Sequence, residues 1–111
     1  MIHVLVSRDD RGNISSLKVE GHSGFDVAGQ DIVCSAVSAI VQTAVIGLMD
    51  VVGIEPIYHQ ENGLAHLDIP LGLPEDIIKE IGIVLETMLL GLKSIELGYS
   101  EYITIRERKV E

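Results

Sequence analysis

Apolar positions recur at every second residue in two parts of the chain, which is the spacing of strands with one buried face. Residues 2–7 and 14–20 show this spacing on either side of a turn-forming stretch at 9–13, which predicts a hairpin. Residues 56–61 and 64–69 flank Asn62-Gly63, a dipeptide typical of two-residue hairpin turns. Pro56 cannot donate to a sheet ladder, so we expect it at the start of its strand or on an edge. These patterns predict two hairpins.

Two longer segments have the apolar content of helices. Residues 32–49 carry no charge and few polar side chains, so we expect a central helix whose faces are nearly all covered by protein. Asp31 is a suitable N-cap, because a short carboxylate accepts hydrogen bonds from the first free amides. Gly47 and Gly53 predict the fraying end of this helix and its stop. From Pro74 to Gly98, apolar residues recur at helical spacing opposite charged ones, which predicts an amphipathic second helix.

Residues 99–107 predict one more strand, followed by a charged tail at 108–111. The predicted order is therefore β-β-α-β-β-α-β. Such an order is typical of an α+β fold, here a two-layer sandwich of two helices on a mainly antiparallel sheet. Because the chain has 111 residues, 47% of them apolar, and no internal linker, we expect one domain spanning residues 1–111.

The composition narrows the setting in which the protein works. One cysteine cannot form an internal disulfide, and residues 1–4 lack the basic and then apolar pattern of a secretory signal, so we expect a cytoplasmic protein. The uncharged stretch 32–49 raises the question of a membrane span. Polar residues at 35, 38, 42 and 43 interrupt it, and it falls short of the ~20 predominantly apolar residues that a bilayer requires. We therefore interpret it as a core helix and expect no membrane partner.

The formal net charge of −9 comes entirely from the middle of the chain. Residues 19–78 contain nine acidic residues and no Lys or Arg, whereas the two flanks together contain eight acidic and eight basic residues. Nucleic acid is a poor direct partner for such a chain, since phosphates require a basic surface. A basic protein or peptide is a better match, although many acidic domains use their charge only for solubility.

The only cysteine, Cys34, is expected in the first turn of the central helix, and His22 at the end of the preceding strand. The helix dipole and exposed amides lower the pKa of a thiol at that position, and a neighbouring imidazole can take its proton. Amides of the first turn can also hold the oxyanion that forms when a thiolate attacks a carbonyl. These features predict an acyl-transfer site. The alternatives are that Cys34 packs as a small core residue or acts as a redox switch.

Two polar residues near this pair allow more than one interpretation. Asp31 is a candidate orienting residue for His22, but helix capping alone explains it equally well. Ser38 lies one turn after Cys34 on the same helix face, where it can reach the site or bond to its own backbone.

A second group of histidines raises the question of a metal site. His59 and His66 become cross-strand partners if Asn62-Gly63 forms a two-residue turn, and Asp68 follows two residues later. These side chains resemble a sparse metal site, but a solvated face of the sheet explains them better. We expect no metal and no organic cofactor.

Two stretches around the cysteine and the histidine resemble the signature of the Prp family, the ribosomal-processing cysteine proteases of certain bacteria. They are Gly21-His22 and Gly29-x-Asp31-Ile32-Val33-Cys34-Ser35-Ala36-Val37-Ser38. Length, acidic character and order of elements are similar to the family over the whole chain. The resemblance implies Cys34 as nucleophile and His22 as general base. It also implies a homodimer that cleaves the amino-terminal extension of the large-subunit ribosomal protein L-twenty-seven.

The expected site also includes residues that bind the substrate. They lie before and within the central helix, at Gly21, Ser23, Gly24, Phe25, Gly29 and Ser38. The resemblance implies cleavage after bulky apolar residues and before basic ones, which suits a charge-poor crevice with acidic surroundings. The main alternative is a non-catalytic acidic binder or assembly factor for a basic ribosomal protein.

Overall fold

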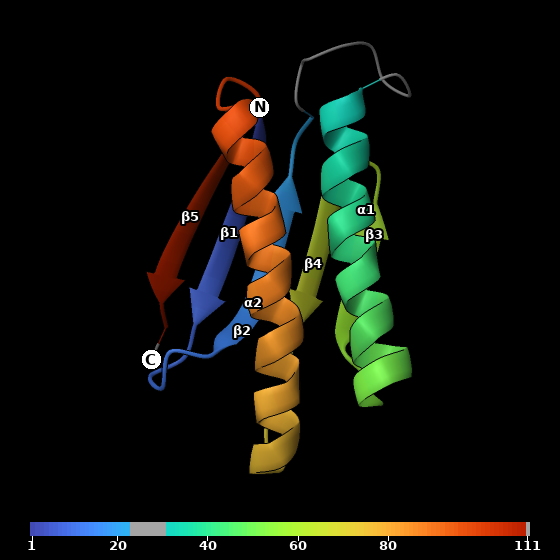
Figure 1. Cartoon of the computed structure of the whole chain (residues 1–111), viewed down its shortest axis with the longest axis vertical. Coiled ribbons are helices and arrows are strands. Elements are labelled where there is room, and N and C mark those ends of the chain that lie inside the picture. Colours follow the sequence, from blue (N-terminus) through green and yellow to red (C-terminus); the bar gives the residue numbers. More distant parts are fainter. Residues whose placement is uncertain (23–30, 111) are drawn as a thin grey trace.

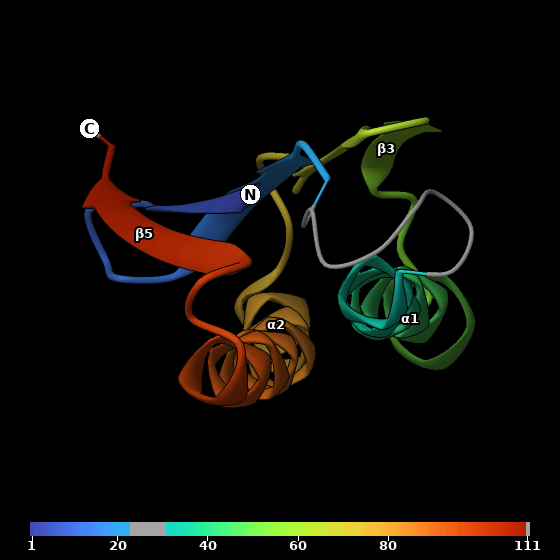
Figure 2. The same cartoon turned by 90° about the horizontal axis from the view of Figure 1, so that it is seen from above.

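The computed structural model describes residues 1–22 and 31–110, which form a five-stranded sheet and two helices. The elements, in chain order, are β1 (Ile2–Arg8), β2 (Ile14–Glu20), α1 (Ile32–Ile46), a π-helical extension of α1 (Gly47–Val52), β3 (Ile57–Glu61), β4 (Leu64–Asp68), α2 (Glu75–Gly98) and β5 (Ile103–Lys109). Both helices lie on the same side of the sheet (Figure 1 and Figure 2). The predicted α+β fold with two layers is therefore confirmed.

The strands are arranged in the order β3-β4-β2-β1-β5. The two predicted hairpins are present, β1 with β2 and β3 with β4, and β2 pairs with β4 so that the hairpins join in antiparallel fashion. β5 instead lies parallel to β1. β3 is an edge strand, as allowed for above, but it begins at Ile57, so Pro56 lies one residue before the strand and not at its first position. This order places the turn of the second hairpin beside the end of β2, where His22 follows.

The hydrophobic core lies between the two layers. One face of the sheet supplies it, because Val4, Val6 and Leu17 are buried while His3 and Lys18 on the other face are exposed. The buried cluster consists of Ile2, Val4, Val6, Ile14, Leu17, Val33, Val37, Val41, Ala44, Val45, Leu48, Leu67, Ile81, Leu85, Met88, Leu89, Leu92 and Ile103. Burying one Val, Leu or Ile side chain contributes about 1.5–3 kcal/mol, so this shared cluster holds both helices to the sheet.

The helix α1 has a buried and an exposed side, so the expectation that protein covers nearly all of its faces is wrong. Val33, Val37 and Val41 are buried, whereas the side chains of Ile32 and Ile46 are 54% and 56% exposed. The reason is the thickness of the fold. The two helices form a single layer on the sheet (Figure 2). Within the described residues of one chain, no further layer covers the face of α1 that is turned away from the sheet.

The end of α1 also differs from the prediction. Gly47 does not fray the helix but has right-handed helical dihedral angles, and the chain continues through a π-helical turn to Val52. Gly53 ends the helix as predicted. Its φ of 87° is left-handed, which glycine tolerates best, and its amide donates to the Leu48 carbonyl oxygen at 2.9 Å.

This extension changes the argument about a membrane span. The continuous helix Ile32–Val52 has 21 residues and is long and apolar enough to cross a membrane by length and composition. The prediction that the stretch is too short is therefore wrong. The finding is a weak indication of a membrane span, because core helices of globular domains pass the same test. Here one side of the helix is buried in the core that it shares with α2 and the sheet.

The second helix and the last strand follow the prediction with one shift. Pro74 precedes α2 and Gly98 ends it, as expected. β5 begins at Ile103 and not at residue 99, because residues 99–102 form a turn closed by a hydrogen bond from the Tyr102 amide to the Tyr99 carbonyl. Residues 108 and 109 pair with β1 and do not form a tail. The full length of β1 sets these bounds, since β5 follows it from end to end.

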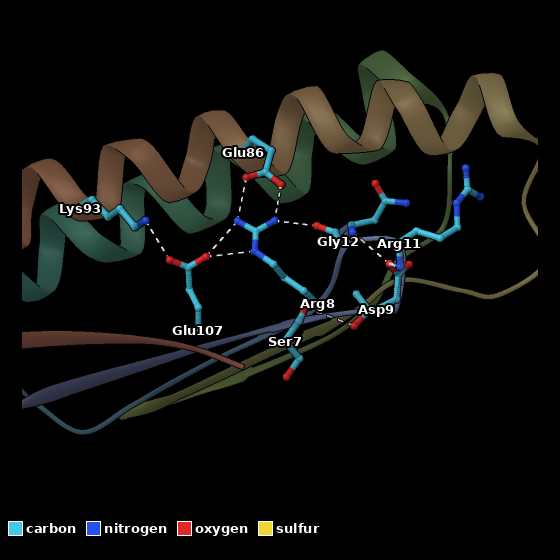
Figure 3. A network of polar contacts seen from close by, with 10 residues as sticks. Ser7, Arg8, Asp9, Arg11, Gly12, Glu86, Lys93 and Glu107 are labelled. Carbon is cyan, nitrogen blue, oxygen red and sulfur yellow. Dashed lines mark hydrogen bonds and ion pairs between the residues drawn. The ribbon is translucent and has the colours of Figure 1, made fainter. Parts of the chain in front are cut away.

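At the end of β1, a group of charged residues joins β1, α2 and β5 (Figure 3). The guanidinium of Arg8 donates two hydrogen bonds to Glu86, at 2.7 and 3.0 Å, and one to Glu107 at 3.0 Å. The ammonium of Lys93 lies 2.8 Å from the second carboxylate oxygen of Glu107. We call these four residues the Arg8 network. Side-chain hydrogen bonds from Lys93 and Arg8 hold the pKa of Glu107 below its usual value.

Candidate active site

A pocket of about 490 Å³ opens between the first turns of α1 and the sheet. The helix contributes Cys34, Val37, Ser38 and Val41, which share one face because they are spaced by three and four residues. The sheet and its loops contribute the opposite wall: Ile2, Val19, Gly21, His22, Tyr58, Gln60, Glu61, Asn62, Gly63, Leu64 and Ala65. The predicted pair of Cys34 and His22 therefore lines one pocket.

Cys34 lies in the first turn of α1 and is partly buried. The N-cap prediction is confirmed, because the Asp31 carboxylate accepts hydrogen bonds from the amides of Val33 at 2.9 Å and Cys34 at 3.0 Å. Asp31 itself is only 5% exposed. These two amides, predicted as oxyanion donors, therefore already have an acceptor. Of the features predicted to stabilise an oxyanion, the one that these hydrogen bonds leave in place is the positive end of the α1 dipole.

His22 follows β2 by two residues, as predicted, and its side chain is exposed. Its carbonyl oxygen accepts a hydrogen bond from the Met1 nitrogen. On the other side, the imidazole lies against the turn of the second hairpin. A Cβ atom on Gly63 would stand 3.1 Å from the His22 Nε2 atom. The described contacts of His22 thus come from the start of the chain and from Gly63.

Gly21 has a structural reason to be glycine. Its φ of 96° is left-handed, and a Cβ there would collide with the carbonyl oxygen of Met1. Its amide donates to the Gly63 carbonyl oxygen at 2.9 Å. Gly21 lines the pocket, as its prediction as a substrate-binding residue requires, and it also fixes the backbone from which His22 projects.

The helix serine Ser38 lines the pocket as well. Its hydroxyl oxygen accepts a hydrogen bond from Gln42 Nε2 at 2.6 Å, so it engages a side chain one turn further along α1. Ser35, by contrast, shows the backbone bonding expected of a helical serine, because its hydroxyl donates to the Asp31 carbonyl oxygen at 3.0 Å. The predicted substrate residues Ser23, Gly24, Phe25 and Gly29 lie outside the described residues.

Sequence reasoning missed the contribution of the second hairpin to this pocket. Tyr58 and Gln60 come from β3, and Asn62 and Gly63 form the turn. Burial raises the pKa of the Tyr58 hydroxyl. The Asn62-Gly63 signal predicted the hairpin but not its place, because that place depends on β4 pairing with β2 rather than on any local pattern.

The pocket combines apolar and acidic lining residues. Val19, Val37 and Val41 supply part of the apolar wall, whereas Asp31 and Glu61 are acidic. Among the described lining residues there is no Lys or Arg. This character agrees with the predicted charge-poor crevice in acidic surroundings.

The histidines of the second hairpin lie elsewhere. His59 and His66 are cross-strand partners, as predicted, and both are exposed. The His66 ring is 3.4 Å from the Asp68 carboxylate. Within residues 1–22 and 31–110, no group of three or more His, Cys, Asp or Glu side chains is placed to hold a metal ion. These histidines belong to the open face of the sheet.

Comparison with known proteins identifies the family to which this chain belongs. The sequence profile described as cysteine protease Prp matches residues 1–104. The chain belongs to the Prp family of cysteine proteases. The ribosomal processing cysteine protease Prp of Bacillus subtilis (strain 168) is 28% identical over 107 residues, which cover 95% of this chain and 96% of that protein. The Prp of Staphylococcus aureus (strain Mu50 / ATCC 700699) is 28% identical over 106 residues, covering 95% and 97%.

Solved Prp structures share the fold. The crystal structure of an essential ribosomal processing protease Prp from S. aureus, in complex with a covalently linked product peptide, matches with a TM-score of 0.87 at 26% identity. A second structure of that protease, with a substrate peptide, matches with a TM-score of 0.82 at 25% identity. Each match covers 97% of this chain and 100% of the other. The protein described here is accordingly a cysteine protease of the Prp fold.

Proposed function

We propose that this Prp protease removes the amino-terminal extension of ribosomal protein L-twenty-seven in the cytoplasm, with Cys34 as nucleophile and His22 as general base. The observation that carries the proposal is the shared pocket, which Cys34 lines from the first turn of α1 and His22 from the end of β2. The relatives from B. subtilis and S. aureus are described as ribosomal processing proteases, which supports a ribosomal protein as substrate.

The chemistry follows from these positions. His22 takes the proton of the Cys34 thiol, and the thiolate attacks the scissile carbonyl carbon. The positive end of α1 favours both the thiolate and the oxyanion that follows. When the tetrahedral intermediate collapses, the peptide C–N bond breaks and the leaving amine takes the proton from His22. Water then attacks the thioester, and the new carboxylate and the free thiol are released. No metal or organic cofactor takes part in these steps.

The walls of the pocket support a peptide with apolar residues before the cut and basic residues after it. Val37, Val41 and Tyr58 offer apolar surface on both sides of the crevice. Glu61 is exposed at its border, where a carboxylate attracts a lysine or arginine of the substrate. The absence of Lys and Arg among the described lining residues supports the same partner and disfavours direct binding of nucleic acid.

The proposal includes a homodimer formed through the helical layer. A groove of about 590 Å³ runs between α1 and α2, and its lining is mostly apolar. Ile83 lies in this groove and is 64% exposed. Exposed apolar surface of this kind is typical of protein interfaces. Ile83→Glu should therefore give monomers in analytical ultracentrifugation. Leu71→Glu should leave the dimer unchanged, since Leu71 is 96% exposed and lies outside the groove.

Peptide cleavage by the wild type and two variants tests the catalytic assignment. The substrate is a synthetic peptide spanning the junction between the extension and the mature ribosomal protein, and mass spectrometry detects the products. Cys34→Ala and His22→Ala should each lower kcat/KM by at least about 10³-fold, because each removes a member of the reacting pair. Undiminished cleavage by Cys34→Ala would contradict the proposal. Binding of the peptide without cleavage by the wild type would favour the acidic binder.

A further inference from the structure

The turn of the second hairpin lies so close to the His22 ring that it leaves little room for a side chain at position 63. The turn joins β3 to β4 through Asn62 and Gly63, since Glu61 and Leu64 are direct cross-strand partners. A Cβ atom on Gly63 would lie 3.1 Å from Nε2 of His22 and 3.7 Å from both Cδ2 and Cε1. The equal distances to the two carbon atoms show that the ring points its Nε2 end toward Gly63.

Backbone contacts hold this arrangement from the other side. The Gly21 amide donates to the Gly63 carbonyl oxygen at 2.9 Å, so the residue before His22 is tied to the same turn. Close packing against Met1 fixes Gly21 in turn, because a Cβ there would collide with the Met1 carbonyl oxygen. Gly63 therefore binds the backbone next to His22 and also lies beside its ring.

We propose that Gly63 is a positioning residue for His22, and that its missing side chain is what lets the imidazole take its working place in the pocket. This inference rests on the proposed function, in which His22 is the general base. A Cβ atom 3.1 Å from Nε2 would be tighter than ordinary van der Waals packing, so a methyl group on residue 63 must displace its neighbour by a few tenths of an ångström. The exposed His22 ring moves more easily than the paired backbone of the hairpin. The displacement therefore falls on the base and not on the fold.

A comparison with Gly12 distinguishes this role of Gly63 from the ordinary need for glycine in a turn. Gly63 has a φ of +79°, which by itself disfavours other residues. Gly12 occupies the turn of the first hairpin with a φ of +84°, but a Cβ there would have nothing within 4 Å among the described residues. Gly12→Ala therefore introduces the same backbone strain as Gly63→Ala without the contact. Gly63→Asn adds the Cβ atom with less backbone strain, since asparagine tolerates a left-handed φ.

The experiment compares Gly63→Ala, Gly63→Asn and Gly12→Ala with the wild type. The junction peptide gives kcat/KM against pH, and iodoacetamide gives the alkylation rate of Cys34 against pH. The second readout needs no substrate and is unambiguous, because the chain has one cysteine. Thermal unfolding shows whether each variant is folded. A shift of a catalytic group by less than 1 Å costs on the order of tenfold in rate.

We expect both Gly63 variants to lose about tenfold in kcat/KM and to shift the pH profile of Cys34 alkylation, while Gly12→Ala keeps both profiles of the wild type. Equal profiles for Gly63→Ala, Gly12→Ala and the wild type would overturn the positioning role. The two proposals fail separately. Wild-type cleavage by His22→Ala would refute the base assignment, whereas loss of activity in His22→Ala with unchanged Gly63 variants would refute only the role of Gly63.

Discussion

The Arg8 network and the candidate active site lie at opposite ends of β1, the strand Ile2–Arg8. β1 connects them, since Ile2 lines the pocket at one end and Arg8 binds two carboxylates at the other. In the network, positive groups of Arg8 and Lys93 face the acids Glu86 and Glu107 directly. In the pocket, the described residues include acids and a histidine but no Lys or Arg.

This difference shows where charge serves the fold and where it serves chemistry. The ion pairs of the Arg8 network join β1, α2 and β5 (Figure 3). Their residues line neither the pocket nor the groove between the two helices. Polar groups around Cys34 face a cavity, where a substrate can meet them. Among the described residues, the Arg8 network is therefore separate from the candidate site. Substitutions at the two ends should have separable effects, on stability at one end and on turnover at the other.

The largest effect should come from Cys34→Ala. The loss of at least about 10³-fold in cleavage proposed above should come with little loss of stability. Cys34 is only partly buried, and its removal leaves the Asp31 cap and the buried valines of α1 in place. Thermal unfolding should give a Tm within about 5 °C of the wild type. A large fall in Tm would show that the thiol also supports the fold.

The opposite pattern is expected for Arg8→Met. This change keeps much of the side-chain volume but removes the guanidinium and leaves Glu86 close to Glu107. We expect a loss of about 1–2 kcal/mol in the free energy of unfolding, or roughly 5–10 °C in Tm, with kcat/KM unchanged. Lys79→Met is a matched control, because Lys79 is an exposed cation of α2 that belongs to none of the described ion pairs. Reduced kcat/KM in Arg8→Met at a temperature where it is fully folded would break the comparison.

The pH dependence of stability provides a check on the same variant. Hydrogen bonds from Lys93 and Arg8 lower the pKa of Glu107 in the folded protein. A carboxylate with a lowered pKa stabilises the fold above its unfolded pKa of about 4.3, and this contribution is lost as the pH falls through the folded value. The wild type should therefore lose stability below about pH 4.3, and Arg8→Met should lose less over the same range. Parallel curves would contradict the assigned role of Arg8.

A smaller effect is expected for Asp31→Asn. Asparagine is as good an N-cap as aspartate, so the amides of Val33 and Cys34 keep an acceptor and the Tm should stay within about 3 °C. The change removes a buried negative charge beside Cys34, and we expect a partial loss of kcat/KM, about five- to tenfold. Activity equal to that of the wild type would remove Asp31 from the candidate catalytic residues and leave it as a cap.

Local chemistry accounts for what the sequence predicted well. Asp31 caps α1, Pro74 precedes α2, and Gly53 and Gly98 end the helices, because each of these features acts on the residues next to it. Both hairpins follow from alternation and turn residues. The signature around Cys34 predicted the right family, and the fold brought Cys34 and His22 to one pocket.

The errors and omissions concern contacts between distant parts of the chain. The parallel pairing of β5 with β1 moved the bounds of the last strand. The single helical layer left one side of α1 exposed. The position of Gly63 beside His22 depends on the order of strands in the sheet, which no stretch of twenty residues determines. Alternation shows which face of a strand is buried but not which strand lies beside it.

The position of β5 also has a consequence for synthesis of the chain. All described residues of the pocket lie between positions 2 and 65, whereas β1 gains its second neighbour only when residues 103–109 are made. At about 5–20 residues per second, the ribosome needs roughly 2–9 s to add the residues from position 66 to the end of β5. During that time one edge of β1 lacks its final partner. An unpaired edge is a template for pairing with other strands, so β1 is open to neighbouring nascent chains until β5 is made.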